Sequence, residues 1–145
     1  MKTFLVGTIT YENKCGAAYC LSLASSSSVF LQKGIVLYPV HVPSLGNDAI
    51  ALNRIFTFAD TQDIDGLVLI SNTMSWTPSN LERMLSTEED VVSAPVLPAD
   101  GYRFQLKKPY DPEKDELYDE LEATSVGLDF LFLRKNVVSD MCATH

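Results

Sequence analysis

The stretch Leu67-Val68-Leu69-Ile70-Ser71-Asn72-Thr73-Met74-Ser75-Trp76-Thr77-Pro78 decides the fold class of this chain of 145 residues. Its apolar beginning follows Gly66 and predicts a short strand that is buried on both faces. Polar residues then form a turn, and Thr77-Pro78 begins a helix, with threonine as the N-cap and proline at the first helical position. An apolar stripe extends this helix over about residues 78–86. A buried strand followed at once by a helix is typical of α/β folds.

Strands and helices alternate on both sides of this stretch. Apolar runs and helical apolar spacing predict strands near residues 3–7, 35–38 and 129–133, extended structure at 91–92, and helices over about 16–30, 48–60 and 137–141. This alternation predicts an α/β fold, a three-layer sandwich with a mainly parallel central sheet. The length fits one domain, residues 1–145. In such sheets ligands bind at the carboxyl ends of the strands, so we expect a site after Val6, Tyr38, Ile70 and Val92.

Local signals add detail to these elements. Residues 8–12 are expected to form the loop that leaves the first strand, and Pro39 and Pro43 are expected to close the second. Gly46-Asn47-Asp48 predicts a turn and a helix cap, and Leu52 fits the apolar stripe of the helix that follows.

Charge and residue content exclude several function classes. The formal net charge of -8 and the pI of about 4.6 disfavour binding to nucleic acid and to anionic membrane surfaces. No apolar stretch approaches the roughly 18 residues of a membrane span, and the N-terminus lacks the apolar run of a signal peptide. We therefore expect the protein in the cytoplasm or in an assembled virus particle. There is no phosphate-binding loop and no dinucleotide-binding glycine motif.

The cysteines and histidines have no metal-ligand spacing. The three cysteines are expected to be reduced and buried, and no metal cluster is expected; the residues are Cys15, Cys20, Cys142, His41 and His145.

The acidic segment, residues 111–122, carries most of the net charge. It contains seven acidic residues against Lys114 alone, which gives -6 of the total -8. Burial of an unpaired charge is costly, so we expect this segment to lie outside the core as a solvated loop. The alternative is a surface arm that docks on a basic protein partner, and an oligomer is compatible with either.

Four segments stand in an informative order along the chain. They are Gly7-Thr8-Ile9-Thr10-Tyr11-Glu12, then Ala51-Leu52-Asn53-Arg54-Ile55, then the strand–turn–helix stretch 67–78, and last Val126-Gly127-Leu128-Asp129-Phe130-Leu131-Phe132-Leu133-Arg134. This order resembles that of the GT-A nucleotide-sugar transferases, and among them the compact family-2-like forms of bacteria and phages. The segments are similar to the family's nucleobase-contacting turn, its A-R-N-R helix, its D-x-D turn and its G-x-G-F strand. The resemblance implies a GT-A fold.

The resemblance also implies which residues would contact a UDP- or GDP-linked sugar. These are Thr8, Tyr11, Glu12, Asn53, Arg54, Ser71, Asn72 and Thr73. Asp129 replaces the second glycine of the last motif and is the candidate catalytic base, with a structural acceptor as the alternative role.

The chain departs from the family where the metal would bind. The family's D-x-D turn holds Mn²⁺ or Mg²⁺ through carboxylates, whereas Ser71-Asn72-Thr73 offers none, so no divalent metal is expected there. Leu52 stands where the family has arginine.

Two functions follow from this comparison. In the first, the chain keeps the fold without the chemistry and is a binding or structural module of a bacterial surface or a virus particle, with no cofactor. In the second, it is a metal-independent glycosyltransferase in which Arg54, Lys107 or Lys108 offsets the charge of the leaving group. We favour the first, because loss of the ion removes several kcal/mol of transition-state stabilisation.

Overall fold

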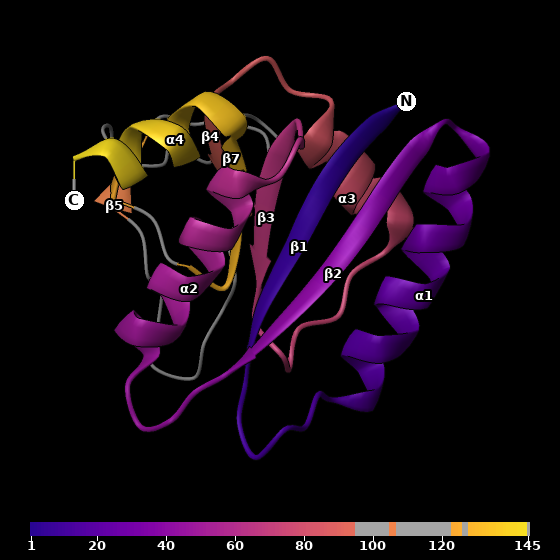
Figure 1. Cartoon of the computed structure of the whole chain (residues 1–145). Coiled ribbons are helices and arrows are strands. Elements are labelled where there is room, and N and C mark those ends of the chain that lie inside the picture. Colours follow the sequence, from indigo (N-terminus) through magenta and orange to yellow (C-terminus); the bar gives the residue numbers. More distant parts are fainter. Residues whose placement is uncertain (95–104, 107–122, 126–127, 145) are drawn as a thin grey trace.

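The computed structural model describes residues 1–94, 105–106, 123–125 and 128–144 (Figure 1). The elements in chain order are β1 (Lys2–Thr10), α1 (Ala17–Gln32), β2 (Ile35–Pro43), α2 (Asp48–Thr61), β3 (Gly66–Ile70), α3 (Pro78–Leu85), β4 (Val91–Ser93), β5 (Gln105–Leu106), β6 (Ala123–Ser125), β7 (Phe130–Arg134) and α4 (Lys135–Ala143). The acidic segment, Lys107 and Lys108 lie outside the described residues. No helix within the described ranges is long and apolar enough to cross a bilayer.

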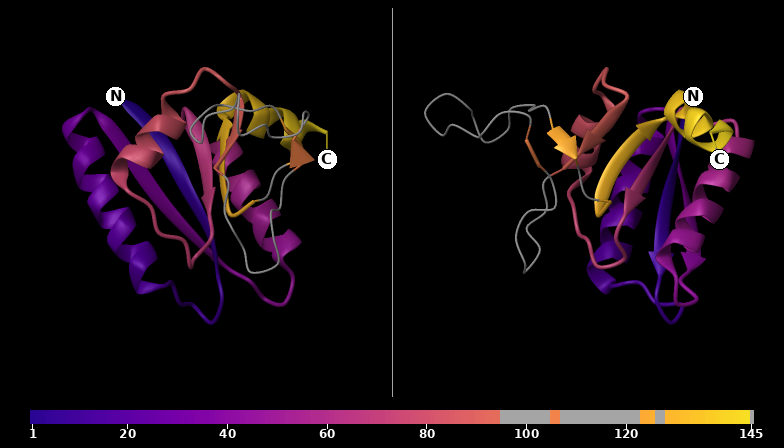
Figure 2. Two further views of the ribbon diagram at one scale, coloured as in Figure 1. Left: turned by 180° about the vertical axis from the view of Figure 1, so that it is seen from behind. Right: turned by 90° about the vertical axis from the view of Figure 1, so that its left-hand side faces the viewer.

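The main sheet has the order β2-β1-β3-β7-β4 and lies between two layers of helices. Helices α1 and α3 cover one face, and α2 and α4 cover the other (Figures 1 and 2). The predicted α/β class and its three layers are therefore confirmed. The strands β5 and β6 form a separate two-stranded sheet.

The sheet is mixed rather than mainly parallel. β1 pairs in parallel with β2 and β3, whereas β7 runs antiparallel to both of its neighbours, β3 and β4. Parallel neighbours need a crossover connection, usually a helix. Within the described residues no helix lies between β4 and β7, and β7 enters the sheet in the opposite direction.

The core forms because the central strands are apolar on both faces. In β3 every residue is buried, as the sequence predicted. Alternate side chains pack in opposite directions: Val68 joins Tyr19, Phe30 and Trp76 on the α1 side, while Leu67 joins the cluster on the α2 side. Gly7 lets α2 approach closely, since a Cβ there would lie only 2.7 Å from Cγ2 of Ile55.

Two strands extend beyond their predicted ends. Residues 8–10, expected in a loop, continue β1, because Thr8 and Thr10 are buried and the pairing with β2 runs on to Pro43. Of the two prolines expected to close β2, the strand passes through Pro39 and ends at Pro43. It is an edge strand, where a residue without an N–H can be accommodated because one side of the backbone has no partner strand.

The helix boundaries agree with the sequence signals. Asn47 caps α2 by accepting a hydrogen bond from the N–H of Ala49 at 2.9 Å, and Thr77 caps α3 through the N–H of Asn80. Leu52 packs partly buried against the core, as expected.

The cysteines differ from expectation in their burial. None of the three is fully buried: Cys20 is exposed, and Cys15 and Cys142 are half-buried. All three are unpaired thiols. Cys20 belongs to the outer face of α1, where the helix periodicity turns it away from buried Tyr19.

Candidate functional site

The carboxyl ends of the three parallel strands meet at one edge of the sheet, as the fold class requires. β1 leads there into the turn that begins at Tyr11, β2 into Ser44, and β3 into Ser71. β7 begins at this edge because it runs the other way, and the N–H of Ser71 donates to the carbonyl oxygen of Asp129 at 2.9 Å.

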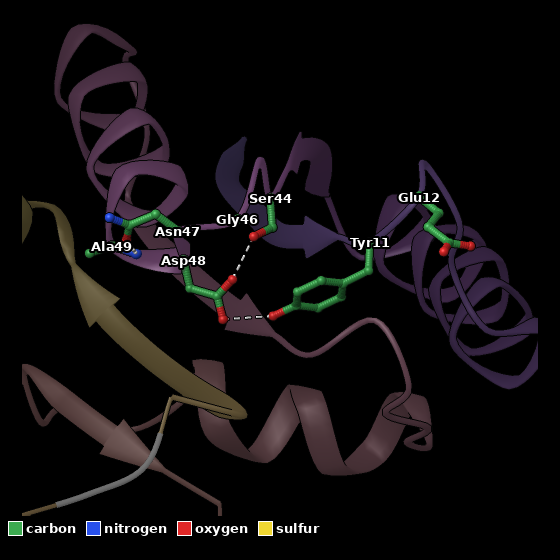
Figure 3. A pocket seen from close by; sticks show the side chains of 7 residues that line it. All are labelled: Tyr11, Glu12, Ser44, Gly46, Asn47, Asp48 and Ala49. Atoms are coloured by element: carbon green, nitrogen blue, oxygen red, sulfur yellow. Dashed lines mark hydrogen bonds between the residues drawn. The ribbon is translucent and has the colours of Figure 1, made fainter.

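An open depression of about 680 Å³ lies at this edge, between the turn after β1 and the start of α2 (Figure 3). The described residues that line it are Tyr11, Glu12, Ser44, Gly46, Asn47, Asp48 and Ala49. Its volume is within the usual range of small-ligand sites.

Asp48 organises this depression through two hydrogen bonds. The hydroxyl of Tyr11 donates to its Oδ2 at 2.8 Å, and the hydroxyl of Ser44 donates to its Oδ1 at 2.7 Å (Figure 3). These two hydrogen bonds lower the pKa of Asp48, which stays ionised at neutral pH. The pKa of Tyr11 is raised, chiefly by its hydrogen bond to Asp48. Partial burial and the charges of Asp48 and Asp129 add to this shift. The carboxylate therefore fixes the tyrosine in its neutral form.

Backbone geometry places Tyr11 at the rim. Glu12 and Asn13 both have positive φ, 54° and 55°, and the N–H of Lys14 donates to the carbonyl oxygen of Tyr11. These are features of a type I′ turn. Glutamate is unfavourable at positive φ, so the surrounding contacts must maintain this turn.

Asn72 supplies such contacts. Its side-chain Nδ2 donates to the carbonyl oxygen of Lys14 at 3.2 Å. Its backbone carbonyl oxygen accepts a hydrogen bond from the N–H of Gly16 at 2.9 Å. The hydroxyls of Ser71 and Thr73 lie 3.4 Å apart beside it. The turn Ser71-Asn72-Thr73 therefore joins β3 to the loop after β1.

The other predicted ligand residues are divided among three places. Tyr11 and Glu12 line the depression. Thr8 is buried, and its Oγ1 lies 2.6 Å from the hydroxyl of Tyr19. Asn53 and Arg54 are exposed on the outer face of α2 and line a different, shallow depression there.

The structure therefore does not bring Asn53 and Arg54 to the edge with Tyr11. The reason is helix periodicity, because Ala51, Ile55 and Ala59 form the buried face of α2 and turn positions 53 and 54 toward solvent. Sequence reasoning also missed Ser44 and the role of Asp48 at the rim. The helix-cap signal Gly46-Asn47-Asp48 pointed to their neighbourhood but not to a pairing with Tyr11.

A second polar cluster lies between β1, α1 and β2. Cys15 Sγ is 3.9 Å from His41 Nδ1, and His41 Nε2 is 3.5 Å from the hydroxyl of Tyr19. Burial raises the pKa of Tyr19 to about 12. Burial also raises the pKa of the Cys15 thiol. Nowhere in the described part of the chain do three His, Cys, Asp or Glu side chains gather as a metal site.

Comparison with known proteins gives a fold but no family. No family model matches the chain, and no curated protein matches it. Among solved structures the chain is similar to the crystal structure of A197 from STIV, a viral protein, with a TM-score of 0.58 and 16% identity. The match covers 95% of this chain and 67% of A197. At this identity the likeness concerns the fold alone.

Proposed function

We propose that this chain is a GT-A-like domain that acts as a non-catalytic binding or structural module. The segment order supports the family resemblance, and the three-layer fold is compatible with it. The depression at the carboxyl edge is a remnant, in this proposal, of the site at which the family holds its sugar donor.

The use of Asn72 is the observation that carries the proposal. Its side-chain amide and its backbone carbonyl oxygen both form hydrogen bonds with the loop of residues 14–16. Hard divalent cations need carboxylate oxygens, which this turn does not offer. In this proposal the turn of residues 71–73 stabilises the loop after β1 and does not hold a metal–diphosphate complex.

The charge of the depression also supports a module without donor chemistry. Glu12 and Asp48 contribute carboxylates to its lining, and Asp48 is ionised. Two carboxylates repel the diphosphate of a nucleotide-sugar unless a cation intervenes.

The alternative is an active, metal-independent glycosyltransferase, and the position of Asp129 favours it. Asp129 immediately precedes β7 at the same edge, and its charge acts on Tyr11. A base beside the depression fits the role that the resemblance implies. Arg54, however, is on the outer face of α2 and would not reach a leaving group there.

Donor titrations separate the two functions. We would follow thermal unfolding with UDP-glucose and GDP-mannose, each with and without Mn²⁺, and measure release of UDP or GDP. The module predicts no donor-induced shift and no release. Donor at a hundredfold excess over its Kd would stabilise a binding protein by about 2.7 kcal/mol, so the shift would be measurable. Release that is lost in Asp129→Asn but kept in Arg54→Ala would establish the enzyme.

A protein partner is part of the proposed function. The acidic segment is the candidate contact, by its charge, in a cytoplasmic or virus-particle assembly. Deleting residues 111–122 and joining the ends with a short Gly/Ser linker should leave the unfolding transition in place and remove association that is sensitive to salt. Unfolding of this deletion variant would show that the segment is structural.

A further inference from the structure

Cys15 and His41 form a pair that the proposed function does not use. Cys15 precedes α1 and His41 lies in β2, and the fold brings Sγ and Nδ1 to 3.9 Å. His41 is exposed and Cys15 is half-buried, so an ion from solvent can reach both. The two side chains come from different elements, and neither is tied to the depression lined by Tyr11 and Asp48.

We propose that Cys15 and His41 bind a soft monovalent cation, Cu⁺, between Sγ and Nδ1. Thiolate and imidazole are ligands that suit copper, and thiolate favours its reduced form. Cu⁺ displaces the proton of the Cys15 thiol, which is released to solvent. With metal–ligand bonds as long as those of zinc, about 2.3 Å to sulfur and about 2.0 Å to nitrogen, ligand atoms on one ion lie roughly 3.5 Å apart at a tetrahedral angle and roughly 4.3 Å apart in a line. The observed 3.9 Å lies between these values, so the separation of the two atoms is compatible with one ion bound to both.

The ligand number selects copper over zinc. Zinc in structural sites takes four protein ligands, and catalytic zinc takes three. The described residues offer no third His, Cys, Asp or Glu at this place. A two-ligand pair with one sulfur therefore matches a cation that accepts low coordination.

The other ring nitrogen of His41 has the surroundings expected around a metal ligand. Nε2 is 3.5 Å from the hydroxyl of Tyr19, which lies 2.6 Å from Thr8 Oγ1 inside the core. If Nε2–H donates to Tyr19, and Tyr19 donates to Thr8, then Nδ1 carries the free lone pair that faces Cys15. The rings of Tyr19 and His41 also pack edge to face at 5.9 Å. Tyr19 is thus a positioning residue for His41.

The test is anaerobic titration of the full chain with Cu⁺ supplied as its acetonitrile complex, in competition with the chromophoric chelator bicinchoninate. The wild type should take one equivalent from the chelator. Cys15→Ser and His41→Ala should each weaken the apparent affinity at least tenfold. Tyr19→Phe should weaken it roughly tenfold, because Tyr19 positions the ligand His41 without contacting the ion. The matched controls Cys20→Ser and Cys142→Ser should bind as the wild type does.

Several results would overturn the proposal. These are failure of the wild type to compete for Cu⁺, full binding by His41→Ala, loss of binding in Cys20→Ser alone, and equally tight binding of Zn²⁺ under the same conditions. Far-ultraviolet circular dichroism of each variant shows whether it is folded. His41 is exposed, so its variant remains a test even if Cys15→Ser does not fold.

Discussion

The side-chain amide of Asn72 donates a hydrogen bond to the carbonyl oxygen of Lys14, 58 residues earlier in the chain, at 3.2 Å. This contact connects the end of β3 to the type I′ turn that places Tyr11. An ionised aspartate could not make this contact, because its carboxylate has no donor.

Introducing a carboxylate here should therefore harm the fold without creating a metal site. Asn72→Asp loses the donor and sets a negative oxygen against the Lys14 carbonyl, so we expect a loss of about 0.5–1.5 kcal/mol in the free energy of unfolding. Urea denaturation measures it. Thr73→Asp is the matched control, since Thr73 is exposed and a change within about 0.5 kcal/mol is expected. Stabilisation of Asn72→Asp by Mn²⁺ would contradict this account.

The serine run of α1 contains one serine that the core requires. Ser26 is fully buried and its Oγ accepts a hydrogen bond from Nε1 of Trp76 at 2.8 Å. Ser26→Ala leaves that indole N–H unpaired and should cost about 1–3 kcal/mol of unfolding free energy.

The neighbouring serine is the control for this prediction. Ser25 is exposed, so Ser25→Ala should be neutral or slightly stabilising, because alanine has the higher helix propensity. Equal effects of the two substitutions on the chemical denaturation midpoint would argue against a specific role for the Trp76 contact.

Ionisation of Tyr19 should destabilise the folded protein at high pH. Its pKa is raised to about 12 from 10.0, chiefly by burial. A group whose pKa is raised on folding contributes stability that is present below its unfolded pKa and is lost as the pH rises through the folded value. The wild type should therefore lose this contribution between about pH 10 and 12.

Tyrosinate absorbance during a pH titration measures the ionisation of Tyr19 that underlies this loss. Tyr19→Phe should remove the tyrosine titration near pH 12, whereas Tyr38→Phe, at an exposed position, should retain it. Loss of the contact with Thr8 should also cost Tyr19→Phe about 1–2 kcal/mol at neutral pH. An unchanged titration curve in Tyr19→Phe would contradict the assignment.

Lys135 should stabilise the end of α2. Its Nζ donates to the carbonyl oxygens of Ala59, Asp60 and Gln62 at 2.6, 2.7 and 2.8 Å. The last carbonyls of a helix have no partner within the helix, and a cation there is favourable. Lys135→Met should cost about 1.5–3 kcal/mol, measured by thermal or urea unfolding.

A second lysine provides the comparison. Lys33 pairs with Glu82 at 2.7 Å, but both side chains are nearly half exposed. Such pairs contribute about 0–1 kcal/mol, so Lys33→Met should have a much smaller effect than Lys135→Met. A reversed order would mean that the carbonyl contacts of Lys135 add little.

Local patterns predicted the elements well and the site only in part. The apolar run at Leu67 and the Thr77-Pro78 signal need only nearby residues to form a strand and a helix start, and both elements are where the pattern put them. The predicted end of β1 was wrong, because the pairing with β2 decides how far β1 extends. Asn53 and Arg54 were placed at the site by likeness to a motif, whereas the buried face of α2 turns them to solvent.

The sequence by itself determined the α/β class, the order of its main elements and the absence of carboxylates at Ser71-Asn72-Thr73, because these depend on residue type and short-range periodicity. The tertiary structure alone decided three things. It reversed β7, it joined Tyr11 to Asp48 across 37 positions, and it brought Cys15 within 3.9 Å of His41. Each is a contact between residues far apart in the chain, which arises only when buried strands and helices pack into one arrangement and carries no signal in the spacing of the residues concerned.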